Sequence, residues 1–167
     1  TRVRSSAASD VYKRQVVIVG AGFIGSEVAA AARLRGCEVT IVEANDAPLV
    51  RGLGHQVGSA CGSLHEAAGV DLRLGLEVTT VYGGPTVEEV ELNDGSRVPA
   101  DLVVVGIGAS PNTEWLKDSG LTINDGVVCD KTLNAGIPGI YAAGDVARAP
   151  NQWLGTCLLY TSDAADD

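Results

Sequence analysis

Residues 16–29 read VVIVGAGFIGSEVA, and this stretch decides the fold. Its first four residues form a continuous apolar run, as expected for a parallel strand that is buried on both faces. The glycine loop GAGFIG of residues 20–25 follows, and an alanine-rich segment closed by Gly36 then indicates a helix with a glycine stop. Strand, glycine loop and helix in this order predict the start of a nucleotide-binding βαβ unit.

The three glycines of the loop have separate roles in such a unit. Gly20 allows the tight turn from strand to helix, and Gly22 has no side chain, so the backbone can approach a pyrophosphate. Gly25 lets the helix lie close to the sheet. The helix N-terminus offers free N–H groups and a partial positive charge to the phosphates. A tight turn between strand and helix that binds no ligand is the alternative interpretation of the loop.

An acidic residue follows at the distance that the dinucleotide fingerprint requires. Residues 39–42 predict a second strand, which ends at Glu43, about 20 residues after the loop. A carboxylate at this place can accept both hydroxyls of an adenosine ribose. The 2′-phosphate of NADP(H) would meet a like charge there, and the next residues, Ala44-Asn45-Asp46, supply no arginine. The sequence therefore favours NAD(H).

The middle of the chain predicts the rest of a doubly wound sheet. Residues 51–69 indicate a second helix, and residues 70–74 a third strand. Residues 76–82 and 86–92 are β-like, and the Asn-Asp-Gly-Ser turn that follows indicates a hairpin. The apolar residues of the second helix share one face: Val57, Ala60, Cys61, Leu64 and Ala68.

A further buried strand over residues 101–105 ends at Gly106-Ile107-Gly108. Two glycines at the carboxyl end of a strand suit the close approach of a ligand, and this edge of an open sheet is where ligands bind. A plain turn before a helix cap at Asn112 is the alternative. The predicted fold class is α/β, with a Rossmann-like doubly wound parallel sheet and a three-stranded antiparallel meander.

Composition and charge exclude several classes of function. The net charge of −9 argues against binding to nucleic acid or to an anionic membrane. No apolar stretch reaches the roughly 18 residues of a membrane helix, and the start has no signal-like apolar core, so we expect a soluble, cytoplasmic protein. The four cysteines form no Cys-x-x-Cys pair and only two histidines exist, which predicts no metal site and buried structural cysteines.

The two ends of the chain differ from the rest. Residues 1–15 read TRVRSSAASDVYKRQ and residues 156–167 read TCLLYTSDAADD. Neither shows the period of a helix or strand that joins the rest, and both resemble translated sequencing-adapter sequence. We therefore expect these two segments to be non-native tails, and the biological part to span roughly residues 16–155.

A second stretch with a ligand-facing shape is IYAAGD, residues 140–145. An apolar run stops abruptly at Gly144 and Asp145, as at a strand end that meets a ligand. A simple helix cap is the alternative role of the aspartate, and in both interpretations we expect a helix to start near Val146.

Four segments together carry a family resemblance: residues 16–29, TIVEA at 40–44, LVVVGIGASPNT at 102–113 and GIYAAGDVAR at 139–148. They resemble the two-domain pyridine nucleotide-dependent flavoprotein reductases. The resemblance is closest to the NADH-dependent ferredoxin reductases of bacterial oxygenase systems, including the rubredoxin and putidaredoxin reductase type. It implies an NAD(H)-binding domain over residues 16–113 and a partial FAD-binding domain over residues 114–155.

The resemblance also implies roles for single residues. Near the adenosine half of NAD(H), Glu43 would hold the ribose and Arg51 would lie at the adenosine end. The nicotinamide half would pass over Gly106, Ile107 and Gly108, and Glu27 would contact the nicotinamide amide near the flavin. Asp145 would accept a hydrogen bond from the FAD ribityl chain, and Gly144 would allow its close approach. The pyrophosphate would be lined by Gly20, Gly22, Phe23, Ile24 and Gly25.

The implied activity is the passage of a hydride from NADH to FAD, and then of electrons to a ferredoxin-type iron–sulfur protein. No catalytic side chain or metal is needed from this segment, because the cofactors carry the chemistry. A related NADH oxidase or peroxidase, nitrite reductase or disulfide reductase is a second interpretation, since a redox cysteine would lie in the part of the FAD domain outside this segment. A third is that the chain as given is an inactive nucleotide-binding fragment.

Overall fold

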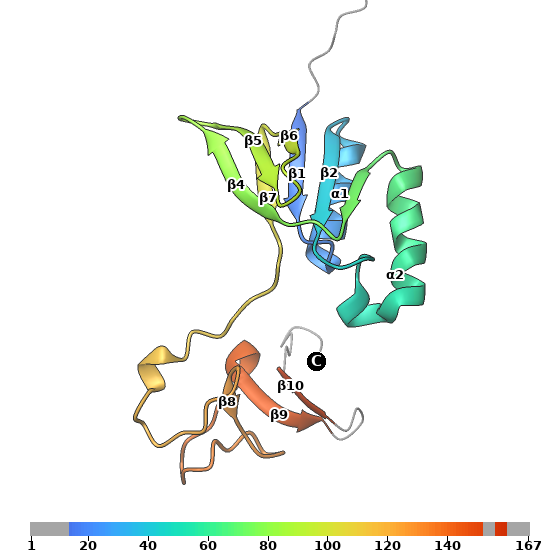
Figure 1. Cartoon of the computed structure of the whole chain (residues 1–167). Helices are drawn as coiled ribbons and strands as arrows, with labels where there is room; N and C mark the ends of the chain where they lie inside the picture. Colours follow the sequence, from blue (N-terminus) through green and yellow to red (C-terminus); the bar gives the residue numbers. More distant parts are fainter. Residues whose placement is uncertain (1–13, 152–155, 160–167) are drawn as a thin grey trace, which may run out of the picture. The chain divides into compact units, whose positions relative to one another are not determined.

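The computed structural model describes residues 14–151 and 156–159. Contacts within the chain divide it into two compact units, Thr1–Gly108 and Ala109–Asp167. The boundary at residue 113 between an NAD(H)-binding and a FAD-binding domain stays a prediction. Figure 1 shows the elements of both units, coloured along the sequence.

The first unit consists of a βαβαβ core, a three-stranded meander and one further strand. Its elements are β1 (Gln15–Val19), α1 (Phe23–Leu34), β2 (Glu38–Glu43), α2 (Val50–Ala67), β3 (Asp71–Leu74), β4 (Val78–Gly83), β5 (Val87–Leu92), β6 (Arg97–Pro99) and β7 (Leu102–Val105). Four of the strands form a parallel sheet with the order β3-β2-β1-β7, and β4, β5 and β6 form a separate antiparallel sheet. Both sheets and the fold class agree with the prediction.

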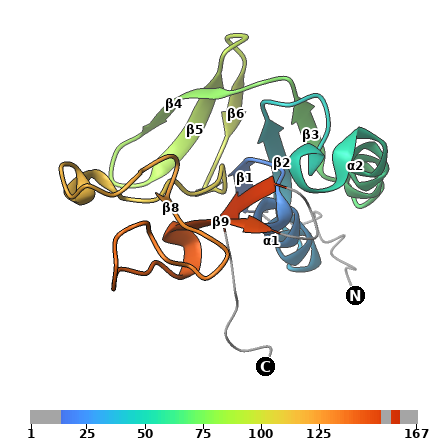
Figure 2. The same cartoon turned by 90° about the horizontal axis from the view of Figure 1, so that it is seen from below.

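The two faces of the parallel sheet bury different sets of side chains. On one face, Ile18 and Ile41 are fully buried and pack with Ala29 of α1. On the other face, Val17 and Val42 pack with residues of β5 and β6, including Leu92. Because both faces are covered, the strands have continuous apolar runs in place of an alternating pattern. Figure 2 shows the meander strands and the two helices from a second direction.

Helix α1 begins and ends where the sequence predicts it. Gly22 is its N-cap, and the chain leaves the helix after Leu34. Gly36 has a positive φ of 78°, and its N–H donates to the Arg33 carbonyl at 2.9 Å, which is a glycine stop. The Arg33 side chain donates to the carbonyls of Cys37 and Ala68, so it links the helix end to the segments that enter β2 and β3.

Helix α2 lies where it was predicted, but its apolar face is not the side that packs. The buried positions are Gly58 and Gly62, one turn apart, and a Cβ on Gly58 would lie 2.2 Å from the Pro48 carbonyl oxygen. Val57 and Leu64 of the predicted face are 50% and 70% exposed. The glycines allow the helix backbone to approach more closely than the larger apolar side chains would. Gly54 has a non-helical backbone (φ 73°, ψ 171°) and separates the first turn from the rest.

The second unit is small. Its elements are the 3₁₀ turns η1 (Glu114–Leu116) and η2 (Gly144–Val146) and the strands β8 (Val127–Val128), β9 (Ala147–Asn151) and β10 (Thr156–Leu159). The strands form one sheet with the order β10-β9-β8. Leu116, Cys129 and Ala147 are among the residues of its buried core. Of the cysteines expected to be buried, Cys129 is buried, whereas Cys37 and Cys61 are only half-buried.

Two predictions about the IYAAGD stretch are wrong. Residues 140–143 form no strand, and only Tyr141 makes an isolated bridge, to Asn134. No α-helix starts near Val146, because β9 follows directly after the single 3₁₀ turn η2. Ala147 and Ala149 are buried and alternate with more accessible neighbours, which is the period of a strand, and Pro150 would interrupt a helix.

The prediction that the two ends contain no strand is wrong at the residues nearest the fold. Gln15 is the first residue of β1, and Thr156–Leu159 pair antiparallel with β9. Residues 1–13 and 160–167 lie outside the described part of the chain. The adapter-like origin of both ends stays a prediction.

The described residues contain neither a membrane-spanning helix nor a cluster of metal ligands. None of their helices has the length and apolar character that crossing a membrane requires. Within residues 14–151 and 156–159, no group of three or more histidine, cysteine, aspartate or glutamate side chains is arranged to hold a metal ion.

The packing of α2 leads to a test with two substitutions. Gly58→Ala should lower the free energy of unfolding by about 1–3 kcal/mol, because its Cβ would overlap the Pro48 carbonyl. Leu64→Ala, at an exposed position, should change it by less than about 0.5 kcal/mol. Urea unfolding of both variants measures the difference, and a larger loss for Leu64→Ala would contradict the observed packing.

Candidate functional site

The glycine loop and the end of β7 meet at the carboxyl edge of the parallel sheet. The Gly20 N–H donates to the Val42 carbonyl and the Gly106 N–H donates to the Val19 carbonyl, both at 2.8 Å. A Cβ on Gly20 would lie 2.5 Å from the Gly106 carbonyl oxygen. In the strand order β3-β2-β1-β7, the chain winds in one direction from β1 to β3, while β7 lies on the other side of β1. Such a reversal point is where open α/β sheets bind ligands.

The glycines of the loop differ in what surrounds them. A Cβ on Gly25 would lie 2.0 Å from the Gly20 carbonyl oxygen, so the fold itself requires a glycine there. Gly22 has an ordinary φ of −75°, and among the described residues beyond its immediate neighbours in the chain a Cβ on it would meet no atom within 4 Å. The protein's own packing does not explain this glycine, whereas close approach of a ligand to the backbone does.

The start of α1 is also suited to an anion. Gly22, the N-cap, has no side chain to accept hydrogen bonds from the first turn, and that turn contains no acidic residue. The N–H groups of a first helical turn have no partner within the helix, and they carry the positive end of the helix dipole. A pyrophosphate placed over Gly22 would meet these donors.

Glu43 is buried at the same edge and contacts the loop directly. The residue is 9% exposed. Its Oε2 accepts a hydrogen bond from the Ala21 N–H at 2.6 Å, and its Oε1 accepts bonds from the backbone N–H and the side-chain amide of Asn45. These bonds compensate the burial of the charge and hold the carboxylate beside the glycine loop.

The other predicted NAD(H)-site residues surround this loop in the first unit. Phe23 and Ile24 are 59% and 68% exposed at the start of α1, and Glu27 is exposed one turn later. The Phe23 ring covers Gly52, where a Cβ would lie 2.8 Å from a ring carbon. Arg51 precedes this contact; it is exposed and forms no hydrogen bond or ion pair with the residues that the structure describes.

On the β7 side, Ile107 is 66% exposed and Gly108 has a positive φ of 109°. Ile24 lies beside this segment, since a Cβ on Gly106 would be 3.9 Å from its side chain. The structure thus brings together the residues that were predicted from separate segments of the first unit.

The two predicted flavin residues lie in the second unit. Gly144 has a positive φ of 71°, and a Cβ on it would meet no atom within 4 Å from the described residues beyond its chain neighbours. Asp145 is exposed within η2. An open glycine beside an accessible carboxylate suits the expected contact with a ribityl chain, and the role of both residues stays a prediction.

Sequence reasoning missed three residues that shape the site. Ala21 donates to Glu43, and its carbonyl accepts the Leu49 N–H at 3.0 Å. Leu49 has a left-handed backbone (φ 55°), which is rare for such a side chain, and no sequence signal predicts it. Asn45 could have been noticed, because asparagine often bonds to groups two residues away and stands that far from the acid.

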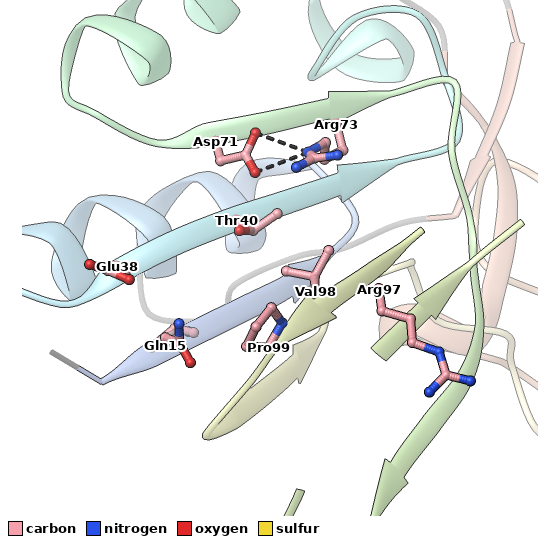
Figure 3. Close-up of a pocket in the computed structure, with 9 residues that line it drawn as sticks. Gln15, Glu38, Thr40, Asp71, Arg73, Arg97, Val98 and Pro99 are labelled. Carbon is pink, nitrogen blue, oxygen red and sulfur yellow. Dashed lines mark hydrogen bonds and ion pairs between the residues drawn. The ribbon is translucent and has the colours of Figure 1, made fainter. Parts of the chain in front are cut away.

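A hollow of about 170 Å³ lies at the opposite edge of the sheet, near the amino ends of β1, β2 and β3. Gln15, Glu38 and Asp71 line it, together with Arg73 and Arg97 (Figure 3). Both arginines are already paired: Arg73 with Asp71 at 2.9 Å, and Arg97 with Glu89 and Glu91 at 2.6 and 3.0 Å. Because ligands bind at the carboxyl edge of such sheets, we do not place the nucleotide in this hollow.

Comparison with known proteins agrees with the geometry. The family model described as pyridine nucleotide-disulphide oxidoreductase matches residues 2–156. The chain belongs to this family. It is 43% identical over 148 residues to the biphenyl dioxygenase system ferredoxin–NAD(+) reductase component of Paraburkholderia xenovorans, covering 89% of this chain and 36% of that protein. It is 37% identical to the rubredoxin–NAD(+) reductase of Ectopseudomonas oleovorans, covering 89% and 39%.

Solved structures of the family have the same fold. The covalent putidaredoxin reductase–putidaredoxin complex matches with a TM-score of 0.83 and 35% identity, over 89% of this chain and 36% of that chain. The ferredoxin reductase of a Rhodopseudomonas palustris system matches with a TM-score of 0.82 and 36% identity, over 90% of this chain and 37% of that chain. The present chain thus spans about a third of the length of the curated relatives that it matches.

The contrast between Gly22 and Gly25 is testable. Gly22→Ala should change the free energy of unfolding by at most about 1 kcal/mol, the usual size of an N-cap effect. It should weaken NADH binding on the order of tenfold, because its Cβ would occupy the space of the pyrophosphate. Gly25→Ala should instead lower stability by about 1–3 kcal/mol.

Urea unfolding and calorimetric titration of the two variants distinguish these effects. If Gly22→Ala binds NADH as tightly as the unchanged chain, the pyrophosphate does not lie over this glycine.

The position of Glu43 predicts the choice between the two nucleotides. The 2′-phosphate of NADPH would lie against a buried carboxylate, and Asp46 adds a second acid nearby in sequence. NADH should therefore bind on the order of tenfold more tightly than NADPH in parallel titrations. Equal dissociation constants would contradict the proposed ribose contact.

Proposed function

We propose that the chain is the NAD(H)-binding part of a FAD-dependent oxidoreductase, in which a hydride passes from NADH to FAD and electrons then pass to a ferredoxin-type iron–sulfur protein. The observation that carries the proposal is the open space beside Gly22 at the start of α1, together with the buried Glu43 carboxylate that bonds to the same glycine loop. Packing among the residues that the structure describes does not fill that space, and a dinucleotide pyrophosphate with its adenosine ribose suits both groups.

The binding role of each residue follows from its place around the loop. The backbone at Gly20, Gly22 and Gly25 approaches the pyrophosphate, with Phe23 and Ile24 along its side. Glu43 accepts hydrogen bonds from the adenosine ribose, and the exposed Arg51 guanidinium lies toward the adenosine end. These groups belong to the glycine loop, the start of α1, the end of β2 and the first turn of α2.

The nicotinamide half extends toward the β7 side. Gly106 and Gly108 carry no side chains, so the backbone at the end of β7 can lie close to it, with Ile107 as an apolar neighbour. Glu27 supplies an acceptor for the nicotinamide amide. When bound, NADH supplies the hydride and FAD accepts it. The contribution of these residues is to orient the nicotinamide ring, because hydride transfer requires near contact and alignment.

In the second unit, Gly144 and Asp145 provide one part of the flavin site. The Asp145 carboxylate is exposed and accepts a hydrogen bond from the ribityl chain. The positive φ of Gly144 turns the backbone immediately before it, without a side chain in the way.

The proposed electron acceptor rests on the relatives. Those cited above are named as reductases of ferredoxin or rubredoxin, and one solved relative is a complex with putidaredoxin. We therefore propose a ferredoxin-type iron–sulfur partner for the whole protein, and the cytoplasm as its location.

A second candidate function is that of a related disulfide reductase, and one solved structure supports it. A NAD-dependent persulfide reductase matches with a TM-score of 0.79 and 28% identity, over 87% of this chain and 27% of that one. Identity to the ferredoxin reductases is higher, which favours the first proposal. A redox-active cysteine in the remainder of the FAD domain would favour the second.

The 167-residue chain alone should behave as a nucleotide-binding fragment. It should purify without visible flavin absorbance and reduce no dye with NADH, because it spans about a third of its relatives and holds only one part of the flavin site. Absorbance spectra and a dye-reduction assay measure both properties. A chain extended over the full open reading frame is the control, and it should be yellow and active. A yellow, active fragment would overturn this assignment.

A further inference from the structure

The Glu43 carboxylate already has three hydrogen-bond donors. The Ala21 N–H donates to Oε2 at 2.6 Å and the Asn45 N–H donates to Oε1 at 2.9 Å. The Asn45 side-chain Nδ2 donates to the same Oε1. A carboxylate has about four lone-pair sites, two on each oxygen. Both sites on Oε1 are therefore occupied, and one site on Oε2 takes no bond from the residues that the structure describes.

An adenosine ribose brings two hydroxyls to this carboxylate. If each donates one hydrogen bond, the ribose needs two acceptor sites, but the present arrangement leaves one. One of the three internal donors must therefore leave, or one hydroxyl must stay without this acceptor.

Two of the three donors cannot leave easily, because they belong to the backbone. Ala21 lies in the glycine loop, and its carbonyl is bonded to the Leu49 N–H. Asn45 is fixed through its carbonyl, which accepts the Gly75 N–H at 3.0 Å, while the Glu43 carbonyl accepts the Leu76 N–H at 3.1 Å. The Asn45 side chain belongs to an exposed residue and needs only to rotate into solvent.

We propose that the Asn45 side chain sets the affinity for the nucleotide by occupying the Glu43 acceptor that one adenosine-ribose hydroxyl takes on binding. This inference rests on the proposed nucleotide-binding function. Asn45 competes with the ribose, and the bound nucleotide displaces its amide from Oε1. The amide also compensates the buried carboxylate while no nucleotide is bound, which is a physical reason for its presence.

The competition has a specific consequence. Removal of the amide leaves Oε1 with a free acceptor site, so binding no longer breaks an internal hydrogen bond. Removal of the amide should therefore raise the affinity for the nucleotide. This gain in affinity depends on the ribose hydroxyl that takes the Oε1 site, and it does not depend on the pyrophosphate or the nicotinamide. A merely structural role of Asn45 would change the affinity for all adenine nucleotides alike.

The test is calorimetric titration of the 167-residue chain and its Asn45→Ala variant with NADH. The variant should bind NADH about two- to tenfold more tightly, the equivalent of one exposed hydrogen bond that need not be broken. Asn124→Ala removes the same amide from an exposed asparagine of the second unit, and it should leave the affinity unchanged. Urea unfolding of both variants checks that they are folded.

A second set of titrations uses ADP, 2′-deoxy-ADP and 3′-deoxy-ADP. The gain of Asn45→Ala should appear with ADP and be lost with one of the two deoxy nucleotides, which identifies the hydroxyl that takes Oε1. Unchanged or weaker binding of NADH by the variant would overturn the inference, as would a gain that persists with both deoxy nucleotides. If the unchanged chain binds no NADH, the proposed function fails and the inference fails with it. Binding of NADH without any effect of Asn45 rejects the inference alone.

Discussion

The close approach of helix α1 to the end of β1 is the constraint on which the rest of the structure depends. A Cβ on Gly25 would lie 2.0 Å from the Gly20 carbonyl, and a Cβ on Gly20 would lie 2.5 Å from the Gly106 carbonyl. Three backbone segments therefore come together at one edge of the sheet with no side chains between them. This contact aims the first turn of α1 at the edge and places the end of β7 beside it. A nucleotide bound there would contact the backbone of both segments.

The buried Glu43 carboxylate depends on the same contact. It takes one hydrogen bond from the glycine loop and two from Asn45, so its position is set by backbone groups and by one movable side chain. A charge in so enclosed a place is tolerated because it is hydrogen-bonded. The same bonds limit how many further donors it can accept. The three hydrogen bonds thus have two effects: they fix the position of the Glu43 carboxylate, and they compete with a bound ribose for its lone pairs.

Much of the first unit could be predicted from local patterns, because its strands and helices follow directly from apolar runs and glycine stops. The tight turn at Gly20 and the close packing of α1 at Gly25 were also predictable, since the geometry of such a loop requires both. The packing side of α2 was not predictable in this way. Its apolar residues Val57 and Leu64 are exposed, while Gly58 and Gly62 form the contact. A pattern of apolar residues records burial by large side chains and does not register contacts made by glycine.

In the second unit, too, the local sequence pattern did not predict the secondary structure. A glycine and an aspartate after an apolar run indicated a strand end and a helix start, yet η2 leads directly into β9. Whether a short segment such as residues 147–151 forms a helix or a strand is decided by its neighbours, here β8 and β10, which lie on either side of it.

By itself, the sequence determined the parallel sheet, the glycine loop and the acid at the end of β2, because these depend on spacing along the chain. It thereby also indicated the class of ligand. Only the tertiary structure decided that Gly22 faces open space while Gly25 faces the protein, and that the lone pairs of Glu43 are shared with Ala21 and Asn45. The reason is that the free space at Gly22 and the bond from Ala21 depend on atoms from segments apart in sequence, which no local pattern of residues records. The bonds from Asn45 are the exception, because this residue lies two positions from Glu43 and a local pattern could indicate them.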